Sequence, residues 1–270
     1  MISFDISGRV AVITGGYGVL CSAMAREMAK AGARIAILGR DEEKAKKLAD
    51  SITAEGGEAI GVKADVLNID SLKAARDTVM KHYGRVDILI NGAGGNKTEA
   101  TTSPDLSFFD LPQDAIQWVV NLNLLGTIYP TQVFGRIMAE QDSGCIVNIS
   151  SMAAFTPLTN TIAYSAAKAA ISNFTQWMSV HFNQVYSRNI RVNAIAPGFL
   201  LTQQNKYLLE DEEGNPTERG RKIIAGTPMG RYGLPEELVG GVIYLCSDAA
   251  SFVTGTVLVI DGGFSAYSGV

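Results

Sequence analysis

Three side chains that can handle protons and carbonyl groups, Ser151, Tyr164 and Lys168, lie close together in the sequence. Tyr164 and Lys168 are four residues apart in an expected helix, so their side chains emerge on one face, one turn apart. Tyrosine has an ordinary pKa of about 10, and a nearby ammonium lowers it toward the range useful for acid–base catalysis. Ser151 ends an expected strand, where its hydroxyl could hydrogen-bond a carbonyl oxygen. The trio predicts proton transfer to or from a carbonyl group.

A glycine-rich turn supplies the second chemical signal. Gly15, Gly16 and Gly18, in the stretch TGGYGVLC, lie between an apolar run and an expected helix. Backbone amides and the positive end of a helix can hold a pyrophosphate at such a place. Alone this pattern is weak, because small residues also serve tight packing. Cys21 stands where the last glycine of such a turn is usual, and we expect it to be a buried packing residue rather than a reactive thiol.

The elements that must position these residues alternate along the chain. Apolar, β-branched runs predict seven strands, and longer amphipathic patterns predict the helices between them. The expected strands are residues 9–14, 34–39, 59–64, 86–91, 144–150, 189–196 and 255–261. The expected helices are residues 18–32, 41–56, 68–84, 113–139, 163–186 and 234–248. This alternation predicts an α/β fold, a doubly wound Rossmann-type domain whose seven-stranded parallel sheet carries helices on both faces.

Two irregular segments interrupt the alternation. Residues 94–112 are rich in Thr, Ser and Asp, and residues 200–228 contain the charged stretch LLEDEEGNPTERGRK. Both follow the carboxyl end of a strand, where open α/β sheets bind their ligands. We therefore expect residues 1–270 to form one domain in which these two segments are the substrate loops.

Composition excludes several classes of function. A net charge of −4 argues against nucleic-acid partners, and no apolar run is long enough to span a membrane. Without a targeting segment at its start, the chain is expected in the cytoplasm. Cys21, Cys145 and Cys246 are far apart in the sequence, and His82 and His181 lack the spacing of metal ligands. We therefore expect buried thiols, no disulfide and no metal.

Short motifs, in order and over nearly the whole chain, resemble those of the short-chain dehydrogenase/reductase family. TGGYGVLC looks like the cofactor turn, ADV at 64–66 like the adenine contact and NGAG at 91–94 like the segment that supports the nucleotide. NLNLLG, ISS, YSAAK and PGFLLT follow in the family's order. The family's turn usually reads TGxxxGxG, whereas here Val19 and Cys21 stand at its second and third glycines and Gly18 lies one place early.

The resemblance implies a role for each matching residue. Tyr164 would be the general acid in carbonyl reduction, Ser151 would hold the substrate oxygen, and Lys168 would bind the nicotinamide ribose and lower the tyrosine pKa. Asn123 would position a proton-relaying water, and Thr202 would hold the carboxamide. The implied cofactor-binding residues are Gly15, Gly16, Tyr17, Gly18, Val19, Arg40, Asp65, Val66, Asn91, Ala93, Gly94, Tyr164, Lys168, Pro197, Gly198 and Thr202.

The choice between NAD(H) and NADP(H) depends on the end of the second strand. Gly39 stands where NAD-selective members usually place an acid, and the guanidinium of Arg40 could pair with a 2′-phosphate. This pair favours NADP(H). If Arg40 only stacks on the adenine, both cofactors would work.

The loop sequences resemble the family's fructuronate reductases, or D-mannonate oxidoreductases, which implies interconversion of D-fructuronate and D-mannonate. A 3-oxoacyl or gluconate-type ketoreductase would use the same catalytic residues, and a non-catalytic dinucleotide-binding scaffold is a more distant alternative. A sugar acid needs partners for its carboxylate, for which the candidates are Asn96, Lys97, Lys206 and Arg219. Apolar helix surfaces at 127–140 and 169–182 suggest subunit contacts, and the resemblance implies a tetramer.

Overall fold

The computed structural model describes residues 2–202 and 205–269 and contains the predicted sheet of seven parallel strands. All seven strands are apolar runs. Each strand pairs in parallel with its neighbours in the sheet. The strands are β1 (Val10–Thr14), β2 (Arg34–Gly39), β3 (Glu58–Lys63), β4 (Ile88–Asn91), β5 (Gly144–Ile149), β6 (Ile190–Pro197) and β7 (Val257–Ile260). Their order across the sheet is β3-β2-β1-β4-β5-β6-β7, so the direction of winding reverses between β1 and β4. The carboxyl edge at such a reversal is where doubly wound folds bind dinucleotides.

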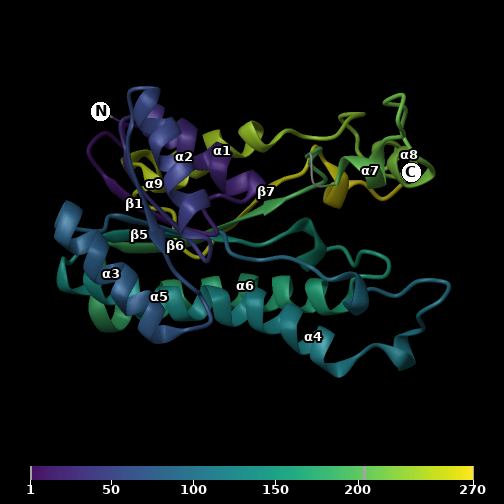
Figure 1. The fold of residues 1–270 in the computed structure, drawn as a ribbon, viewed down its shortest axis with the longest axis horizontal. Coiled ribbons are helices and arrows are strands. Elements are labelled where there is room, and N and C mark those ends of the chain that lie inside the picture. Colours follow the sequence, from purple (N-terminus) through teal and green to yellow (C-terminus); the bar gives the residue numbers. More distant parts are fainter. Residues whose placement is uncertain (1, 203–204, 270) are drawn as a thin grey trace.

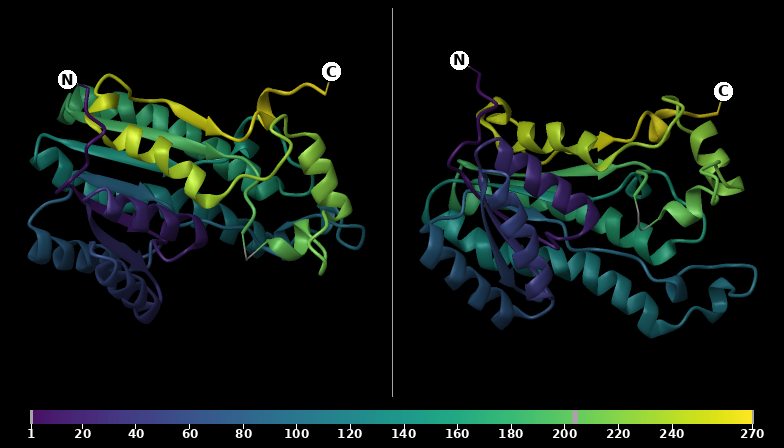
Figure 2. Two further views of the ribbon diagram at one scale, coloured as in Figure 1. Left: turned by 90° about the horizontal axis from the view of Figure 1, so that it is seen from above. Right: turned by 45° about the horizontal axis from the view of Figure 1, so that its top comes forward.

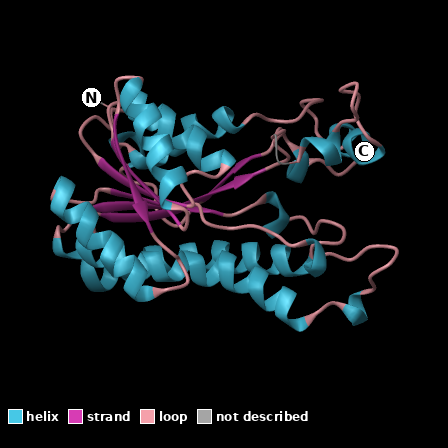
Figure 3. Ribbon diagram, in the orientation of Figure 1, coloured by secondary structure: helices cyan, strands magenta, loops and turns pink. Residues whose placement is uncertain are grey.

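Helices cover both faces of the sheet, which confirms the predicted fold class (Figures 1 and 3). One layer contains α1 (Val19–Lys30), α2 (Glu42–Ala54) and α9 (Val239–Cys246). The opposite layer contains α3 (Ile69–Tyr83), α4 (Gln113–Val120), α5 (Gly126–Glu140) and α6 (Ile162–His181). Strand residues alternate between two buried clusters, one under each layer; Ile35 and Ile37 face α1 and α2, whereas Ala36 and Leu38 face the other side. Burial on both faces explains the nearly continuous apolar strands.

Two π-helical turns and two short helices differ from the sequence-based expectation. The helix expected over 113–139 contains a π-helical segment, η3 (Asn121–Leu125), and a second, η5 (Phe182–Tyr186), ends the long helix that begins at Ile162. The segment 200–228, expected to be irregular, contains α7 (Lys206–Leu209) and α8 (Glu218–Ala225). The Thr217 hydroxyl caps α8 by accepting a hydrogen bond from the Gly220 N–H.

Both expected substrate segments extend beyond the carboxyl end of the sheet. Residues 94–112 follow β4 and lead into α4, whereas residues 200–228 follow β6 and contain α7 and α8. Figures 1 and 2 show the two segments projecting beyond the same end of the sheet, the end at which the C-terminus lies, while the N-terminus lies at the opposite end. The fold therefore brings the two segments to the edge where the glycine turn also lies.

The three cysteines are buried, as expected, with free thiols. Two of them are nevertheless neighbours despite their separation in sequence. The Cys145 thiol donates to the Leu245 carbonyl at 3.2 Å and is hydrogen-bonded to the Cys246 thiol. Within residues 2–202 and 205–269, no cluster of three or more metal-ligating side chains occurs. None of the helices described there is long and apolar enough to cross a membrane.

Candidate active site

The structure brings the four predicted catalytic residues to the carboxyl edge of the sheet. Ser151 follows β5, Tyr164 and Lys168 lie in the first two turns of α6, and Asn123 lies in the π-helical segment before α5. Ser151 lies close enough to the Tyr164 hydroxyl to influence its pKa, and the Lys168 Nζ atom lies 5.4 Å from the Tyr164 ring centroid. Tyr164 and Lys168 therefore lie on one face of α6, as their spacing of four residues predicted.

The π-helical segment directs the Asn123 side chain into the site. Asn123 is fully buried, and its Nδ2 donates to the carbonyls of Gly95 at 2.7 Å and Val119 at 2.8 Å. Its Oδ1 accepts from the Gly95 N–H at 3.3 Å. A π turn is common at functional sites because it changes the direction of a side chain within a continuing helix. The π-helical segment was not predicted, because its residues also fit the pattern of an α-helix.

Burial dominates the electrostatics of the catalytic pair. It lowers the pKa of Lys168 to about 8, because a charged ammonium loses its hydration there. Burial also raises the pKa of Tyr164, and the nearby Ser151 side chain opposes that rise. This differs from the expectation that Lys168 would lower the tyrosine pKa. The Lys168 ammonium donates a hydrogen bond to the Ile149 carbonyl at 2.7 Å, and burial has the larger effect on the pKa of Tyr164.

The glycine turn approaches the loop after β4 at backbone distance. Gly15 has a φ of +61°, and a Cβ placed on it would lie 2.9 Å from the Ala93 Cα. At Gly16 a Cβ would lie 2.8 Å from the Ile13 carbonyl oxygen. These two positions therefore require glycine. Gly18 then begins α1 as its N-cap, so the first turn, from Val19 onward, presents the free amides that attract a phosphate.

Further predicted cofactor contacts also follow the ends of strands. Gly94 lets the loop after β4 pass close to the catalytic residues, since a Cβ there would lie 2.7 Å from the Asn123 Oδ1 and 3.4 Å from the Lys168 Nζ. Asp65 and Val66 follow β3, and Gly198 follows Pro197 at the end of β6. The Gly198 N–H donates to the Ile260 carbonyl at 2.9 Å.

Two predicted contacts have specific local partners. The Asn91 Nδ2 donates to Thr131 and Asn148, whereas its Oδ1 is the one buried side-chain oxygen or nitrogen without a hydrogen bond among the described residues. The Thr202 hydroxyl donates to the Asn205 Oδ1 at 2.9 Å. Thr202 is thus held by the start of α7 at the edge where a nicotinamide carboxamide is expected.

Tyr17 explains the glycine at the end of β2. A Cβ on Gly39 would lie 2.1 Å from the Cε1 of Tyr17, so the tyrosine ring fills the space of any side chain at residue 39. The Tyr17 hydroxyl accepts a hydrogen bond from the Asp41 N–H at 3.2 Å. Arg40 lies beside this contact with its side chain exposed. The acid that would select NAD by binding the ribose is therefore replaced by an aromatic ring.

Comparisons with known proteins agree with this geometry. A family model described as enoyl-(acyl carrier protein) reductase matches residues 19–265. The oxidoreductase UxuB of Bacillus subtilis, described as uncharacterized, is 50% identical over 275 aligned positions that cover 98% of each chain. The chain belongs to the short-chain dehydrogenase/reductase family. The resemblance seen in the sequence motifs is thereby confirmed.

Two crystal structures of this dehydrogenase/reductase family share the fold closely. One, from Haemophilus influenzae with bound NAD, is of a protein provisionally named a D-mannonate oxidoreductase; it has a TM-score of 0.92 and 49% identity, and the match covers 98% of each chain. The other, a gluconate 5-dehydrogenase of Burkholderia cenocepacia with NADP and tartrate, has a TM-score of 0.87, 32% identity and the same coverage. The chain is accordingly an oxidoreductase that uses a nicotinamide dinucleotide.

The substrate candidates in the two segments have different surroundings. The Lys97 Nζ lies 4.7 Å from the centroid of the Trp118 ring in α4, and the Asn96 amide donates to the Thr101 hydroxyl. Lys206 pairs with Glu210 at 3.7 Å, and Arg219 lies exposed in α8. Trp118 was not among the predicted site residues. Its only sequence signal was an aromatic residue on a helix that follows the loop.

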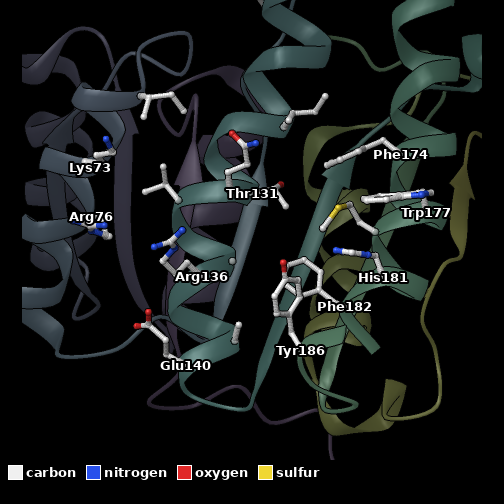
Figure 4. Close-up of a pocket in the computed structure, with 17 residues that line it drawn as sticks. Lys73, Arg76, Thr131, Arg136, Glu140, Phe174, Trp177, His181, Phe182 and Tyr186 are labelled. Carbon is white, nitrogen blue, oxygen red and sulfur yellow. The ribbon is translucent and has the colours of Figure 1, made fainter. Parts of the chain in front are cut away.

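A separate groove lies away from this edge of the dehydrogenase/reductase fold. It has a volume of about 990 Å³ and runs between α3, α5 and the carboxyl-terminal half of α6 (Figure 4). Trp177 and His181 of α6 stack at 4.6 Å beside it, and Arg136 and Glu140 of α5 lie across it. Tyr164 and Lys168 lie in the first turns of α6, so this groove does not contain the catalytic residues.

Proposed function

We propose that this protein interconverts a keto sugar acid and the corresponding hydroxy acid, with D-fructuronate and D-mannonate as the pair. The tetrad of Asn123, Ser151, Tyr164 and Lys168 supports carbonyl–alcohol chemistry. The similarity to the Haemophilus protein named for D-mannonate supports the substrate. In the same proposal, residues 1–270 act as one catalytic unit in which segments 94–112 and 200–228 contact the substrate.

The proposed roles follow from where each side chain lies. The nicotinamide ring supplies the hydride when the cofactor is bound. Ser151 would hold the substrate carbonyl oxygen by a hydrogen bond, and the Tyr164 hydroxyl would donate a proton to that oxygen. Lys168 would bind the ribose hydroxyls of the cofactor. Asn123 would hold a water through which the proton is replaced.

The residues at the strand ends fit a nicotinamide dinucleotide. The turn of Gly15 to Val19 would hold the pyrophosphate at the N-terminus of α1. The loop of Asn91, Ala93 and Gly94 would support the nucleotide, and Asp65 with Val66 would contact the adenine. Pro197, Gly198 and Thr202 would flank the nicotinamide.

The position of Lys97 carries the proposal of an acidic substrate. The Trp118 ring holds its ammonium by a cation–π contact, which leaves the N–H donors free to bind a carboxylate. Trp118 and Tyr164 both pack against the small cluster of Ala100, Ala115, Val119 and Ala163. The shared cluster supports a substrate carboxylate bound by Lys97 near the proposed proton donor. Lys206, in contrast, already faces the carboxylate of Glu210.

The test replaces the charge and keeps the aliphatic stem. We expect Lys97→Met to raise the KM for D-fructuronate by about tenfold or more, with the Kd of the cofactor unchanged. Lys30→Met is the matched control, because Lys30 is exposed at the carboxyl-terminal end of α1, outside both segments, and pairs with Glu27. Uronate kinetics that are unchanged in Lys97→Met and also in Arg219→Met would show that neither cation binds the carboxylate.

A substrate panel separates the alternative functions. Preferred turnover of a 3-oxoacyl thioester or of a gluconate would assign the chain to those reductases instead. Turnover of no carbonyl substrate with either cofactor would favour a non-catalytic dinucleotide-binding scaffold. Retention of both Tyr164 and Lys168 argues against the scaffold, because such proteins commonly lose one of them.

For the cofactor, we propose a preference for NADP(H) over NAD(H). The Tyr17 ring excludes an acid at residue 39, and Arg40 is free to approach a 2′-phosphate. Arg40→Ala should then weaken NADPH binding by about tenfold and leave NADH binding nearly unchanged. A clear catalytic preference of the unmodified enzyme for NADH would contradict this choice.

We also propose a homotetramer in which the groove face of α5 and α6 is a subunit interface. Trp177 and Val180 of α6 are more than half exposed, as are Val185 and Tyr186 of η5. An apolar face of this kind is unusual on a monomer and typical of an interface between copies.

A further inference from the structure

Cys21 and Gly92 occupy one shared space between α1 and the loop after β4. A Cβ placed on Gly92 would lie 2.1 Å from the Cys21 Sγ and 2.9 Å from the Thr14 carbonyl oxygen. Contacts this short do not occur, so the thiol takes the place that any side chain at residue 92 would need. The Cys21 side chain itself is 4% exposed, which leaves it little room to move away.

The contact joins the two walls of the proposed cofactor site. The Thr14 Oγ1 accepts hydrogen bonds from the N–H groups of Gly92 at 3.1 Å and Ala93 at 3.3 Å. Gly15 meets Ala93 backbone to backbone, as described above. Direct contacts therefore set the distance between the glycine turn and the loop after β4. Among these contacts, the Cys21 thiol is a side chain that packs against the backbone of the loop.

The same loop continues into the catalytic residues. Two residues after Gly92, Gly94 approaches the Asn123 Oδ1 and the Lys168 Nζ, and Gly95 exchanges two hydrogen bonds with Asn123. A shift of Gly92 away from α1 would therefore move the backbone that holds Asn123. The spacing at Cys21 thus affects cofactor binding first and the proton relay second.

We propose that Cys21 is a positioning residue whose thiol fills the space that a side chain at residue 92 would need. The family's usual turn has a glycine at residue 21. Here residue 21 carries a side chain, and the glycine at residue 92 leaves room for it. What matters in this proposal is the volume of the thiol and not its redox chemistry.

The thiol is chemically suited to a purely steric role. Burial raises the pKa of Cys21 to about 12, although the charge of the nearby Lys168 ammonium opposes the rise. A thiolate is the reactive form, and at neutral pH almost none is present. Cys21→Ser replaces only the sulfur atom by oxygen and keeps nearly the same size. It should accordingly retain the cofactor affinity of the unmodified enzyme within about threefold.

A double-mutant cycle tests the proposal through the Kd of NADPH and NADH, measured by fluorescence titration. We expect Gly92→Ala to raise that Kd at least about tenfold, because its methyl group meets the Cys21 Sγ. Cys21→Gly alone should change it only a few-fold, since it opens a small space. The double variant, Cys21→Gly with Gly92→Ala, should regain at least about threefold of the lost affinity, because only the contact of the added methyl group with the Thr14 carbonyl oxygen at 2.9 Å remains. Gly240→Ala, whose added methyl group has open space in α9, is the control.

Two results would overturn the proposal. One is Gly92→Ala with a Kd within about threefold of the unmodified enzyme. The other is a double variant that binds no better than Gly92→Ala. If Gly92→Ala fails to fold, Cys21→Met tests the same space from α1; it should raise the cofactor Kd at least about tenfold, and an unchanged Kd in a folded Cys21→Met protein would refute the proposal. Because cofactor binding is measured, the result is independent of which sugar acid is the substrate.

Discussion

Lys168 is buried and Tyr164 beside it is partly buried, and the environment of each disfavours its charged form. An enzyme that donates a proton from a phenol benefits from this, because burial keeps the hydroxyl protonated until the substrate oxygen accepts the proton. The nearby Ser151 hydroxyl marks the place where that oxygen would be held. For Lys168, burial therefore matters as well as charge, because burial lowers the pKa of its ammonium.

Removal of the phenol hydroxyl should abolish the chemistry alone. Tyr164→Phe keeps the ring and its packing, so we expect kcat to fall about 100-fold or more while the cofactor Kd stays within about twofold. Steady-state kinetics and fluorescence titration of NADPH measure the two quantities. A variant that keeps a substantial fraction of the activity would exclude Tyr164 as the proton donor.

Lys168 should make the ligand-free protein more stable at alkaline pH. Its pKa is about 8 when folded and has its ordinary value of 10.5 when unfolded, so between these values the unfolded chain binds more protons. The free energy of unfolding therefore rises with pH from about 8. Below that pH the buried lysine is charged, and the loss of its hydration lowers the stability of the folded protein by the full amount. Cys21 acts in the opposite direction above pH 9, since its folded pKa is about 12.

Lys168→Met isolates this effect. The difference between the two pKa values of Lys168 corresponds to about 3 kcal/mol, of which the lost hydrogen bond to Ile149 removes about 1. We expect the free energy of unfolding of the variant to be about 2 kcal/mol higher at pH 7, and this gain to shrink between pH 8 and 10. The variant should also be inactive. Urea denaturation at several pH values measures it. A gain that does not depend on pH would refute the assignment to the lysine charge.

At the scale of elements, the strands and the position of the proposed catalytic residues at the sheet edge were predictable because their signals are local. Continuous apolar runs predicted all seven strands, and the spacing of Tyr164 and Lys168 predicted their shared face. The contacts Tyr17–Gly39, Cys21–Gly92 and Lys97–Trp118 were not predictable, because each joins residues far apart in sequence. The π turns were missed because their sequences also suit an α-helix.

The helix α8 was missed because charged and polar residues surround a short apolar pair. Thr217 is its N-cap, so Thr217→Ala should lower the stability of this segment by about 1 kcal/mol. If segment 200–228 contacts the substrate, the KM for the sugar acid should rise several-fold while the cofactor Kd is unchanged. Amide hydrogen exchange over residues 218–225 reports the loss directly. Faster exchange without any change in KM would remove α8 from the substrate site.

At the scale of the whole molecule, the two helix layers have different tasks. In the proposed function, the layer of α1, α2 and α9 would provide the helix N-terminus for the phosphates, whereas the layer of α4, η3 and α6 would provide catalytic side chains. The sheet between the two layers fixes the distance between the N-terminus of α1 and the side chains of α6. The exposed apolar face of α6 lies on the outer side of the second layer, next to the groove in Figure 4.

A charge on that face should therefore break the proposed assembly. We expect Trp177→Glu to shift the protein from tetramer to a smaller species in light scattering coupled to size-exclusion chromatography, with its circular dichroism unchanged. Phe252→Glu is a comparison variant on a different surface, because the Phe252 side chain is fully exposed beyond α9. A tetramer that persists in Trp177→Glu would place the subunit contact elsewhere.

The π-helical segment at Asn121–Leu125 also bears on the history of the fold. A π turn holds one residue more than the α-helical turn it replaces, so it corresponds to the insertion of a single codon into an ordinary helix. Such an insertion leaves the packing at both ends in place and rotates only the side chains near it. One small genetic event is thus sufficient to redirect an amide from a helix surface into a reaction centre. Loss of that codon would reverse the change and leave a folded protein without its Asn123 contact.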